Sequence, residues 1–173
     1  MKTLPWLIPI LLTLHNIEEG ITAKEFLSPI GSRIPDFTKD LINPSYLQFL
    51  VALGIFTAIP YLCALSGDLT RKGGLSILFL LVIQMVMFIN VLPHVAMATF
   101  LKGYTPGLIT SVLINLPFSL LLFRAALKDG WLSKKAFLWL IPLAVIAHGP
   151  GLWGLMIVSG HIAKLLSLIV HVY

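Results

Sequence analysis

Three ionisable residues stand close together near the start of the chain, at the end of an apolar run. His15 precedes Glu18 by three positions and Glu19 by four, and these spacings place the three side chains on one face of an α-helix. Two adjacent carboxylates repel each other, and a divalent cation relieves that repulsion. Imidazole nitrogens and carboxylate oxygens are ligands that suit zinc and non-haem iron. The pattern therefore predicts a divalent metal site, with zinc preferred over iron.

More polar residues stand inside the apolar runs that follow. Asn90 and His94 are four residues apart and share one helical face. His148 directly precedes a Gly-Pro-Gly sequence expected to break the helix, so it either joins the site or satisfies freed carbonyl groups. The predicted metal ligands, each an imidazole or a carboxylate, are His15, Glu18, Glu19, His94 and His148. The other polar residues assigned to the site are Asn90 and Asn115.

The composition places these residues in a membrane. Of the 173 residues, 58% are hydrophobic and 11% are charged, and the mean hydropathy is +0.96, whereas soluble domains carry about 25% charged residues. Five apolar runs are long enough to cross a bilayer core of about 30 Å. They are residues 4–22, 46–66, 74–101, 107–126 and 136–158. We therefore predict an all-α, polytopic integral membrane helical bundle of about five transmembrane helices, forming a single transmembrane helical domain over residues 1–173.

The net charge of +5 comes from 12 Lys and Arg residues against 7 acids. These cations stand in short gaps between the apolar runs, where they act as topology signals, so we expect no nucleic-acid partner. An N-terminus on the cytoplasmic side leaves most of the cations on that side, and we predict this orientation in the cell (inner) membrane. The lone Cys63 excludes an intrachain disulfide and a Cys-rich zinc site.

Three segments have more than one interpretation. The first apolar run, after Lys2, also resembles a signal peptide, although Glu18 and Glu19 directly before a cleavage site would be unusual. Residues 22–44 are mixed in character and predict an interfacial loop with room for a short amphipathic turn. Residues 159–173 either extend the fifth helix or lie at the membrane interface.

This orientation also predicts that the polar residues meet. His15 and the two glutamates fall in the last third of an outward-running helix, and His94 falls in the outer half of the third helix. Asn115 lies near the middle of the fourth run and His148 just past the middle of the fifth. A charge at the bilayer centre costs about 2.5–3.5 kcal/mol even on insertion scales, so such groups face a partner or a cavity. We expect one polar cavity nearer the outer face.

Each assignment has a structural alternative. A single histidine such as His15 is more often a hydrogen-bonded structural residue than a ligand. Gln84 and Asn115 suit hydrogen bonds between helices. His161 and His171, near or beyond the last run, suit the interface. For the polar group as a whole, a metal site is preferred over a proton or cation pathway and over a structural network.

Two motifs connect these residues with a known family. Residues 15–19 form H-x-x-E-E and residues 104–107 form Y-x-P-G. With His94 as a further separate histidine, nearly the whole chain resembles the HXXEE membrane protein family, which has no assigned activity. The resemblance implies that His15, Glu18, Glu19, His94 and the Tyr104–Gly107 turn are the functional group. It does not imply a reaction.

A second family is similar in part only. CAAX-type membrane proteases also carry paired glutamates and histidines. Their E-E-x-x-x-R pattern requires an arginine where this chain has Ala23, and their F-x-x-x-H pattern requires a phenylalanine where it has Asn90. That activity is not transferred.

The Y-x-P-G motif has its own physical interpretation. Pro106 fixes its own φ, and Gly107 permits a positive φ, so the motif suits a tight turn before the fourth helix. Tyr104 either anchors the membrane interface or reaches the polar site as a hydrogen-bond donor or general acid.

The preferred functional hypothesis is a metal-dependent, hydrolase-like enzyme that acts on a lipid or other amphipathic substrate from the outer leaflet. His15, His94 and one glutamate would hold the metal, and the other glutamate would act as general base on a metal-bound water. The candidate catalytic residues are Glu18, Glu19 and Tyr104.

Two other hypotheses remain open. The same groups suit a component of a cation- or proton-conducting transporter, although polar residues thin out toward the inner side. A non-catalytic structural membrane protein is the third. Membrane lipid is the expected partner, and the sequence leaves a homo-oligomer open.

Overall fold

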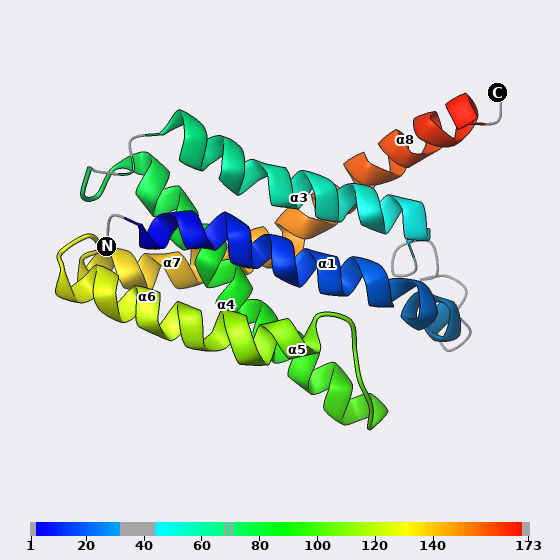
Figure 1. The fold of residues 1–173 in the computed structure, drawn as a ribbon, viewed down its shortest axis with the longest axis horizontal. Helices are drawn as coiled ribbons and strands as arrows, with labels where there is room; N and C mark the ends of the chain where they lie inside the picture. Colours follow the sequence, from blue (N-terminus) through cyan, green and yellow to red (C-terminus); the bar gives the residue numbers. More distant parts are fainter. Residues whose placement is uncertain (1–2, 32–43, 68, 70, 171–173) are drawn as a thin grey trace.

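The computed structural model describes residues 3–31, 44–67, 69 and 71–170, and these form helices and connecting turns without a β-strand (Figure 1). Two of the elements, η1 and η2, are π-helical turns. In chain order the elements are α1 Leu4–Gly31, α3 Tyr46–Ser66, α4 Leu75–Leu101, α5 Leu108–Thr110, η1 Ser111–Asn115, α6 Leu116–Lys128, α7 Lys134–Ile146, η2 Ala147–Gly151 and α8 Leu152–Val170.

The described helices suit a membrane. Four segments are long and apolar enough to cross one: Tyr46–Ser66, Leu75–Leu101, Leu108–Lys128 and Lys134–Ile169. The 28-residue α1 is long enough, but its polar residues lower its hydropathy. Large apolar side chains such as Leu75 and Phe100 are 86% and 82% exposed, as expected for side chains that face lipid. The predicted all-α membrane helical bundle is therefore confirmed.

Helix α4 lies at the centre of the bundle. It packs against α1, α3, α6, α7 and both π-helical turns, and Figure 1 shows α1 and α3 running side by side across it. The apolar core joins Ile8 and Leu12 of α1 to Leu80 and Leu81 of α4 and to Leu122 of α6. Ile8 and Leu12 precede His15 along α1, and Leu80 and Leu81 precede Asn90 along α4. One half of the bundle is therefore packed with hydrocarbon, and the polar residues lie in the other half.

Helix α1 is longer than the sequence pattern predicts. The interfacial loop expected from residue 22 is wrong for residues 22–31, which continue α1, and residues 32–43 of that loop lie outside the described residues. The charged residues Lys24 and Glu25 are good helix formers and do not end a helix. Pro29 and Gly31, at the observed end, are better stop signals.

The last two helices form one continuous helical segment. Residues 159–170 extend the fifth helix, which settles the alternative for that part of the chain. The helix break expected at 149–151 is wrong, because η2 carries the chain through it. There the Leu152 N–H donates to the Ala147 carbonyl, five residues back, a bond that spans the proline, which has no N–H to donate. Figure 1 shows α8 leaving the bundle toward the C-terminus.

Candidate metal centre

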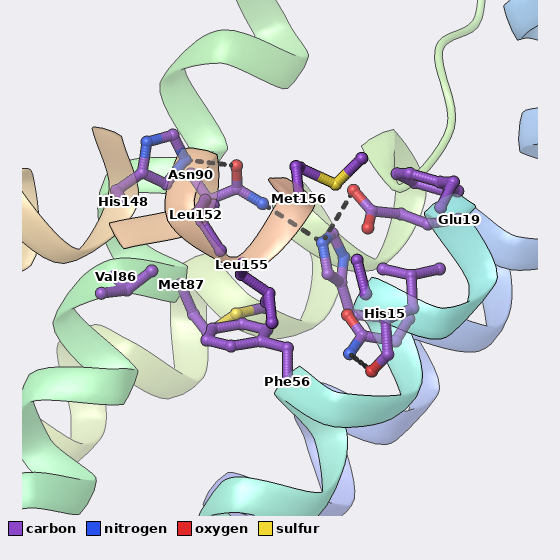
Figure 2. Close-up of a pocket in the computed structure, with 14 residues that line it drawn as sticks. His15, Glu19, Phe56, Val86, Met87, Asn90, His148, Leu152, Leu155 and Met156 are labelled. Carbon is purple, nitrogen blue, oxygen red and sulfur yellow. Dashed lines mark hydrogen bonds and ion pairs between the residues drawn. The ribbon is translucent and has the colours of Figure 1, made fainter. Parts of the chain in front are cut away.

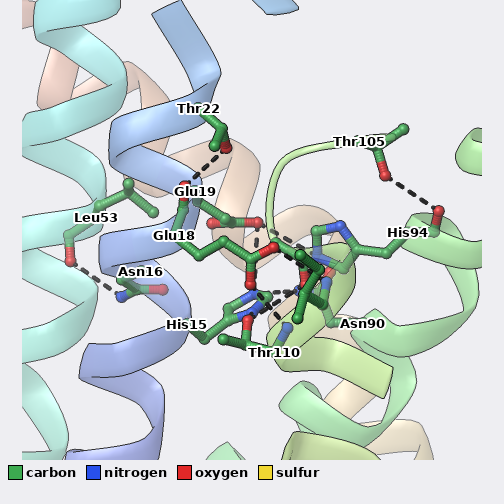
Figure 3. A network of polar contacts seen from close by, with 12 residues as sticks. His15, Asn16, Glu18, Glu19, Thr22, Leu53, Asn90, His94, Thr105 and Thr110 are labelled. Atoms are coloured by element: carbon green, nitrogen blue, oxygen red, sulfur yellow. Dashed lines mark hydrogen bonds and ion pairs between the residues drawn. The ribbon is translucent and has the colours of Figure 1, made fainter. Parts of the chain in front are cut away.

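Three side chains from two helices converge in the polar half of the bundle. His15 and Glu19 come from α1 and His94 from α4 (Figure 3). The Glu19 Oε1 lies 3.4 Å from His15 Nε2 and 3.3 Å from His94 Nε2. One ligand atom of each residue lies within 4.8 Å of the other two. We call these three residues the His–Glu cluster. The predicted meeting of an α1 acid with the α4 imidazole is present in the structure.

The spacing of the cluster suits a small divalent cation. Ligand atoms at about 2.0–2.1 Å from a tetrahedral zinc ion lie about 3.3 Å from one another. The two measured nitrogen–oxygen distances, 3.4 and 3.3 Å, agree with that separation. His15 is 1% exposed, and the side chains of His94 and Glu19 are 11% and 15% exposed. The cluster is therefore compact and largely shielded.

A hydrogen bond outside the cluster orients His15. The Nδ1 of His15 lies 2.7 Å from the Thr110 hydroxyl oxygen, and that hydroxyl donates to the Gly107 carbonyl at 3.3 Å. This contact fixes the orientation of the imidazole ring, and its Nε2 faces the Glu19 carboxylate. Metal-binding histidines are commonly oriented in this way by a second hydrogen bond.

Asn90 links the cluster to His148. Its Nδ2 lies 2.9 Å from His94 Nε2 and 3.3 Å from His15 Nε2. Its Oδ1 accepts a hydrogen bond from His148 Nε2 at 2.8 Å, as Figure 2 shows. The structure therefore places Asn90 in direct contact with the cluster, as the sequence predicts. His148, predicted as a ligand, contacts the cluster through Asn90.

Glu18 lies beside the cluster without joining it (Figure 3). Adjacent residues of a helix are about 100° apart around its axis, so Glu18 and Glu19 face different neighbours. Glu18 Oε1 accepts hydrogen bonds from the Tyr104 hydroxyl at 2.6 Å and the Ile109 N–H at 3.0 Å, and Oε2 accepts one from the Thr110 N–H at 2.7 Å. It thus satisfies free N–H groups at the start of the Leu108–Lys128 helical segment. The sequence predicts Glu18 as a ligand and a base. In the structure its carboxylate is held by the Tyr104 hydroxyl and the start of the next helix.

The Y-x-P-G motif forms the predicted tight turn. Leu108 N–H donates to the Thr105 carbonyl at 3.1 Å, and Gly107 has φ 78° and ψ −3°, as at the third position of a type II turn. A Cβ added at Gly107 would lie 2.7 Å from His15 Cε1 and 2.8 Å from both Glu19 Cγ and His94 Cε1. The glycine backbone therefore packs directly against all three members of the cluster.

Tyr104 remains a hydrogen-bond donor near the cluster. Burial raises the pKa of its hydroxyl, and the hydrogen bond to the Glu18 carboxylate raises that pKa further. The side chain is 44% exposed. The contact with Glu18 connects the Y-x-P-G turn to α1.

Several site residues lie where the sequence pattern did not place them. Thr110 and the close approach of Gly107 were missed, and the only signal for either is their position in or just after the Y-x-P-G motif.

The other predicted polar residues lie away from the cluster. Gln84 donates to Ser119 at 2.8 Å, the predicted type of hydrogen bond between helices. Asn115, predicted for the polar site, is buried in η1, and its Nδ2 has no hydrogen-bond partner among the described residues. His161 is exposed on α8, and His171 lies outside the described residues.

Two cavities adjoin the cluster. One, of about 260 Å³, is lined by the polar residues His15, Glu19, Asn90 and His148 and by apolar side chains of α3, α4 and α8. Figure 2 shows His148, Asn90, His15 and Glu19 joined by a row of dashed contacts, with Met87 and Phe56 below Asn90. We call this the α8 cavity. The other, of about 230 Å³, reaches Glu19 and His94 and is lined by Thr105 and Pro106. We call it the turn cavity.

Comparison with known proteins identifies the class to which this chain belongs. Residues 6–122 match the family described as "Protein of unknown function with HXXEE motif". This match covers more than half of the chain, so the protein belongs to that family. The matched range includes the His–Glu cluster, Glu18, Asn90 and the Y-x-P-G turn. His148 lies beyond it.

A relative of similar length also matches. The chain is 27% identical over 137 residues to "Uncharacterized protein YrkK" of Bacillus subtilis (strain 168), an alignment that covers 78% of this chain and 82% of the relative. No solved structure matches the chain.

Proposed function

We propose that this membrane protein binds a divalent metal ion, zinc in preference to iron, through His15 Nε2, His94 Nε2 and a Glu19 carboxylate oxygen. One observation carries the proposal. His15 Nε2 and His94 Nε2 lie 3.4 and 3.3 Å from the same Glu19 oxygen, and the Thr110 contact holds the His15 ring in this orientation. A carboxylate oxygen that faces two imidazole nitrogens in a shielded site can be neutralised by a proton or by a divalent cation, and the second is the basis of this proposal.

The His94 imidazole strengthens this argument. Its Nε2 accepts from Asn90 Nδ2 and lies 3.3 Å from Glu19 Oε1. Asn90 Nδ2 also lies 3.3 Å from His15 Nε2, so a metal ion would take the place of the Asn90 N–H groups at both imidazole nitrogens. Two histidines and one glutamate are the protein ligands of several zinc hydrolases, in which the fourth position holds water.

The same geometry supports a hydrolase-like enzyme that acts on a lipid or amphipathic substrate. A zinc ion held by these residues would supply a water whose pKa is lowered to about 7. Glu19, whose Oε1 faces the imidazoles, is the carboxylate at the reacting centre, and its second oxygen accepts the proton. Glu18 is a positioning residue that holds Tyr104 and the adjoining helix. The substrate enters the apolar cavities from the outer leaflet, with the N-terminus of the chain cytoplasmic in the inner membrane.

Metal analysis of the purified protein tests the proposal. We expect one zinc per chain after reconstitution, and loss of that zinc in His15→Ala. His161→Ala is the matched control, because this exposed histidine of α8 lies outside the cluster. Wild-type protein that remains free of metal after exposure to zinc would overturn the metal proposal, as would equal zinc binding by His15→Ala.

A proton or cation pathway is a second candidate, supported by one further observation. The Leu108–Lys128 segment carries a row of buried polar residues spaced four apart, which are Ser111, Asn115 and Ser119. The Ser111 hydroxyl and the Asn115 amide nitrogen have no partner among the described residues, and buried polar atoms of this kind often bind internal water. A proton flux in proteoliposomes that Asn115→Leu abolishes would favour the pathway.

A further inference from the structure

Glu19 lies at the junction of two cavities. It lines both the α8 cavity and the turn cavity, and Phe49 of α3 is the other residue that lines both. Their volumes are similar, about 260 Å³ and about 230 Å³. The cluster therefore has a mainly apolar space on each side.

The two cavities follow one another along the same helices. On α1, the α8 cavity contacts residues up to Glu19, and the turn cavity contacts Glu19 and residues after it, such as Phe26. On α4, the α8 cavity contacts residues up to Asn90, and the turn cavity begins at Pro93. The polar groups thus occupy a narrow layer between two apolar compartments.

This arrangement selects the chemistry of a ligand. A charged head group in the apolar part of either compartment would lose its hydration without gaining a partner, which is costly. A neutral carbonyl linkage between two apolar arms would place its polar atoms at the cluster and one arm in each compartment. Each volume is below the range of about 300–1,000 Å³ usual for ligand pockets. One compartment therefore suits one arm and not a whole two-chain lipid.

We propose that the substrate is a neutral ester with an apolar group on each side, its carbonyl at Glu19 and its two arms in the α8 and turn cavities. This inference rests on the proposed hydrolase function. In the reaction, the oxygen of water bonds to the carbonyl carbon, and the bond from that carbon to the alcohol oxygen breaks. One water proton passes through Glu19 to the alcohol oxygen, and the acid and the alcohol leave as separate products.

Two buried alanines provide matched variants. Ala52, 5% exposed, lines the α8 cavity, and Ala23, 2% exposed, lines the turn cavity. Ala52→Leu and Ala23→Leu each reduce the space of one compartment and leave the three residues of the cluster unchanged. Thermal unfolding checks that both variants fold, and Ala52→Val and Ala23→Val replace them if either does not.

Binding of ketones, which cannot be hydrolysed, provides the readout. A dialkyl ketone with two long arms requires both compartments, so we expect each single variant to weaken its binding at least tenfold. A methyl ketone with one long arm can use either compartment. We therefore expect it to bind both single variants and to lose binding only in the double variant.

Each result separates the two proposals. Absence of ketone binding to wild-type protein overturns the two-compartment inference, as does a pattern in which only one alanine matters for both ketones. Zinc content is measured on the same samples. If zinc binds and the ketone pattern is absent, only the ester inference fails. If the ketone pattern is present without zinc, the two-compartment binding stands and the metal proposal fails.

Discussion

At the scale of single residues, Gly107 ties the backbone to the His–Glu cluster. Its φ of 78° lies in the left-handed region, and any Cβ would collide with His15, Glu19 and His94. Any other residue would have a strained backbone here and would place its Cβ against the cluster. Glycine avoids both problems because it has no side chain. The glycine of the Y-x-P-G motif is therefore part of the site's geometry as well as of the turn.

Gly107→Ala should disrupt the cluster. The strained φ alone costs about 1–2 kcal/mol for a residue with a Cβ, and the collisions displace the ligands. We expect a lower melting temperature and loss of the bound zinc. Gly103→Ala is the control, because the nearest atom to its added Cβ is 3.8 Å away. Zinc retention by Gly107→Ala would contradict the proposed packing.

Because of Tyr104, the folded protein should lose stability at alkaline pH. The folded protein raises the pKa of its hydroxyl through burial and the Glu18 carboxylate, so folding favours the neutral form. The resulting stabilisation is fully present below the ordinary tyrosine pKa of about 10 and is lost as pH rises through the higher folded value.

Comparison with Tyr104→Phe isolates this effect. Above a pH of about 10, the melting temperature of the wild type should fall more steeply than that of Tyr104→Phe. Tyr61→Phe serves as the control, because Tyr61 contacts Thr13 rather than an acid. Parallel curves for wild type and Tyr104→Phe would show that the Glu18 contact has no such role.

At the scale of helices, α1 presents its two adjacent glutamates to different partners. Glu19 faces α4, and Glu18 faces the start of the Leu108–Lys128 segment. The H-x-x-E-E motif therefore combines two candidate ligands, His15 and Glu19, with one helix-capping acid, Glu18, and the two glutamates are separated by the rotation of about 100° per residue.

The two glutamates should have separable effects. Glu18→Gln removes a charged acceptor from a helix N-terminus, which we expect to cost about 1 kcal/mol of folding free energy while zinc is retained. Glu19→Gln should lose zinc. Glu25→Gln, at an exposed position of α1, should change neither. The measurements are zinc content and thermal unfolding, and equal zinc loss in both site variants would refute the division of roles.

The π-helical turns were not predictable from periodicity. The turn η1 directly follows Thr110, and η2 contains His148, so both lie at the polar site. A Gly-Pro-Gly sequence predicts a break because of its local preferences. In the structure, a bond over five residues keeps the chain helical, and packing of η2 against α4 accompanies that outcome. Local preference was overridden by tertiary contacts.

At the scale of the whole molecule, the orientation in the membrane decides which side reaches the cluster. The turn before α5 and the turn before α7 lie at opposite ends of the Leu108–Lys128 segment. If the N-terminus is cytoplasmic, the first of these turns faces outward and the second inward. The turn cavity would then lie nearer the outer face.

Cysteine labelling of intact cells tests this orientation. In a Cys63→Ala background, Gly103→Cys should react with a membrane-impermeant maleimide from outside, because Gly103 is exposed in the turn after α4. Lys135→Cys, exposed at the start of α7, should react only after the cells are opened. The reverse pattern would place the N-terminus outside.

The sequence by itself determined the class of fold and most of the residues at the site. Composition and apolar run lengths indicate membrane helices, because a bilayer admits only helices and closed barrels, and runs of about 20 residues match a spanning helix rather than a barrel strand. The spacings of His15 with Glu19 and of Asn90 with His94 place each pair on one helical face. Only the tertiary structure decided that Glu18 turns to Tyr104, that Thr110 orients His15 and that Gly107 covers the cluster. These contacts join α1 to residues more than 80 positions later, and a pattern that repeats within one helix carries no information about which other helix lies beside it.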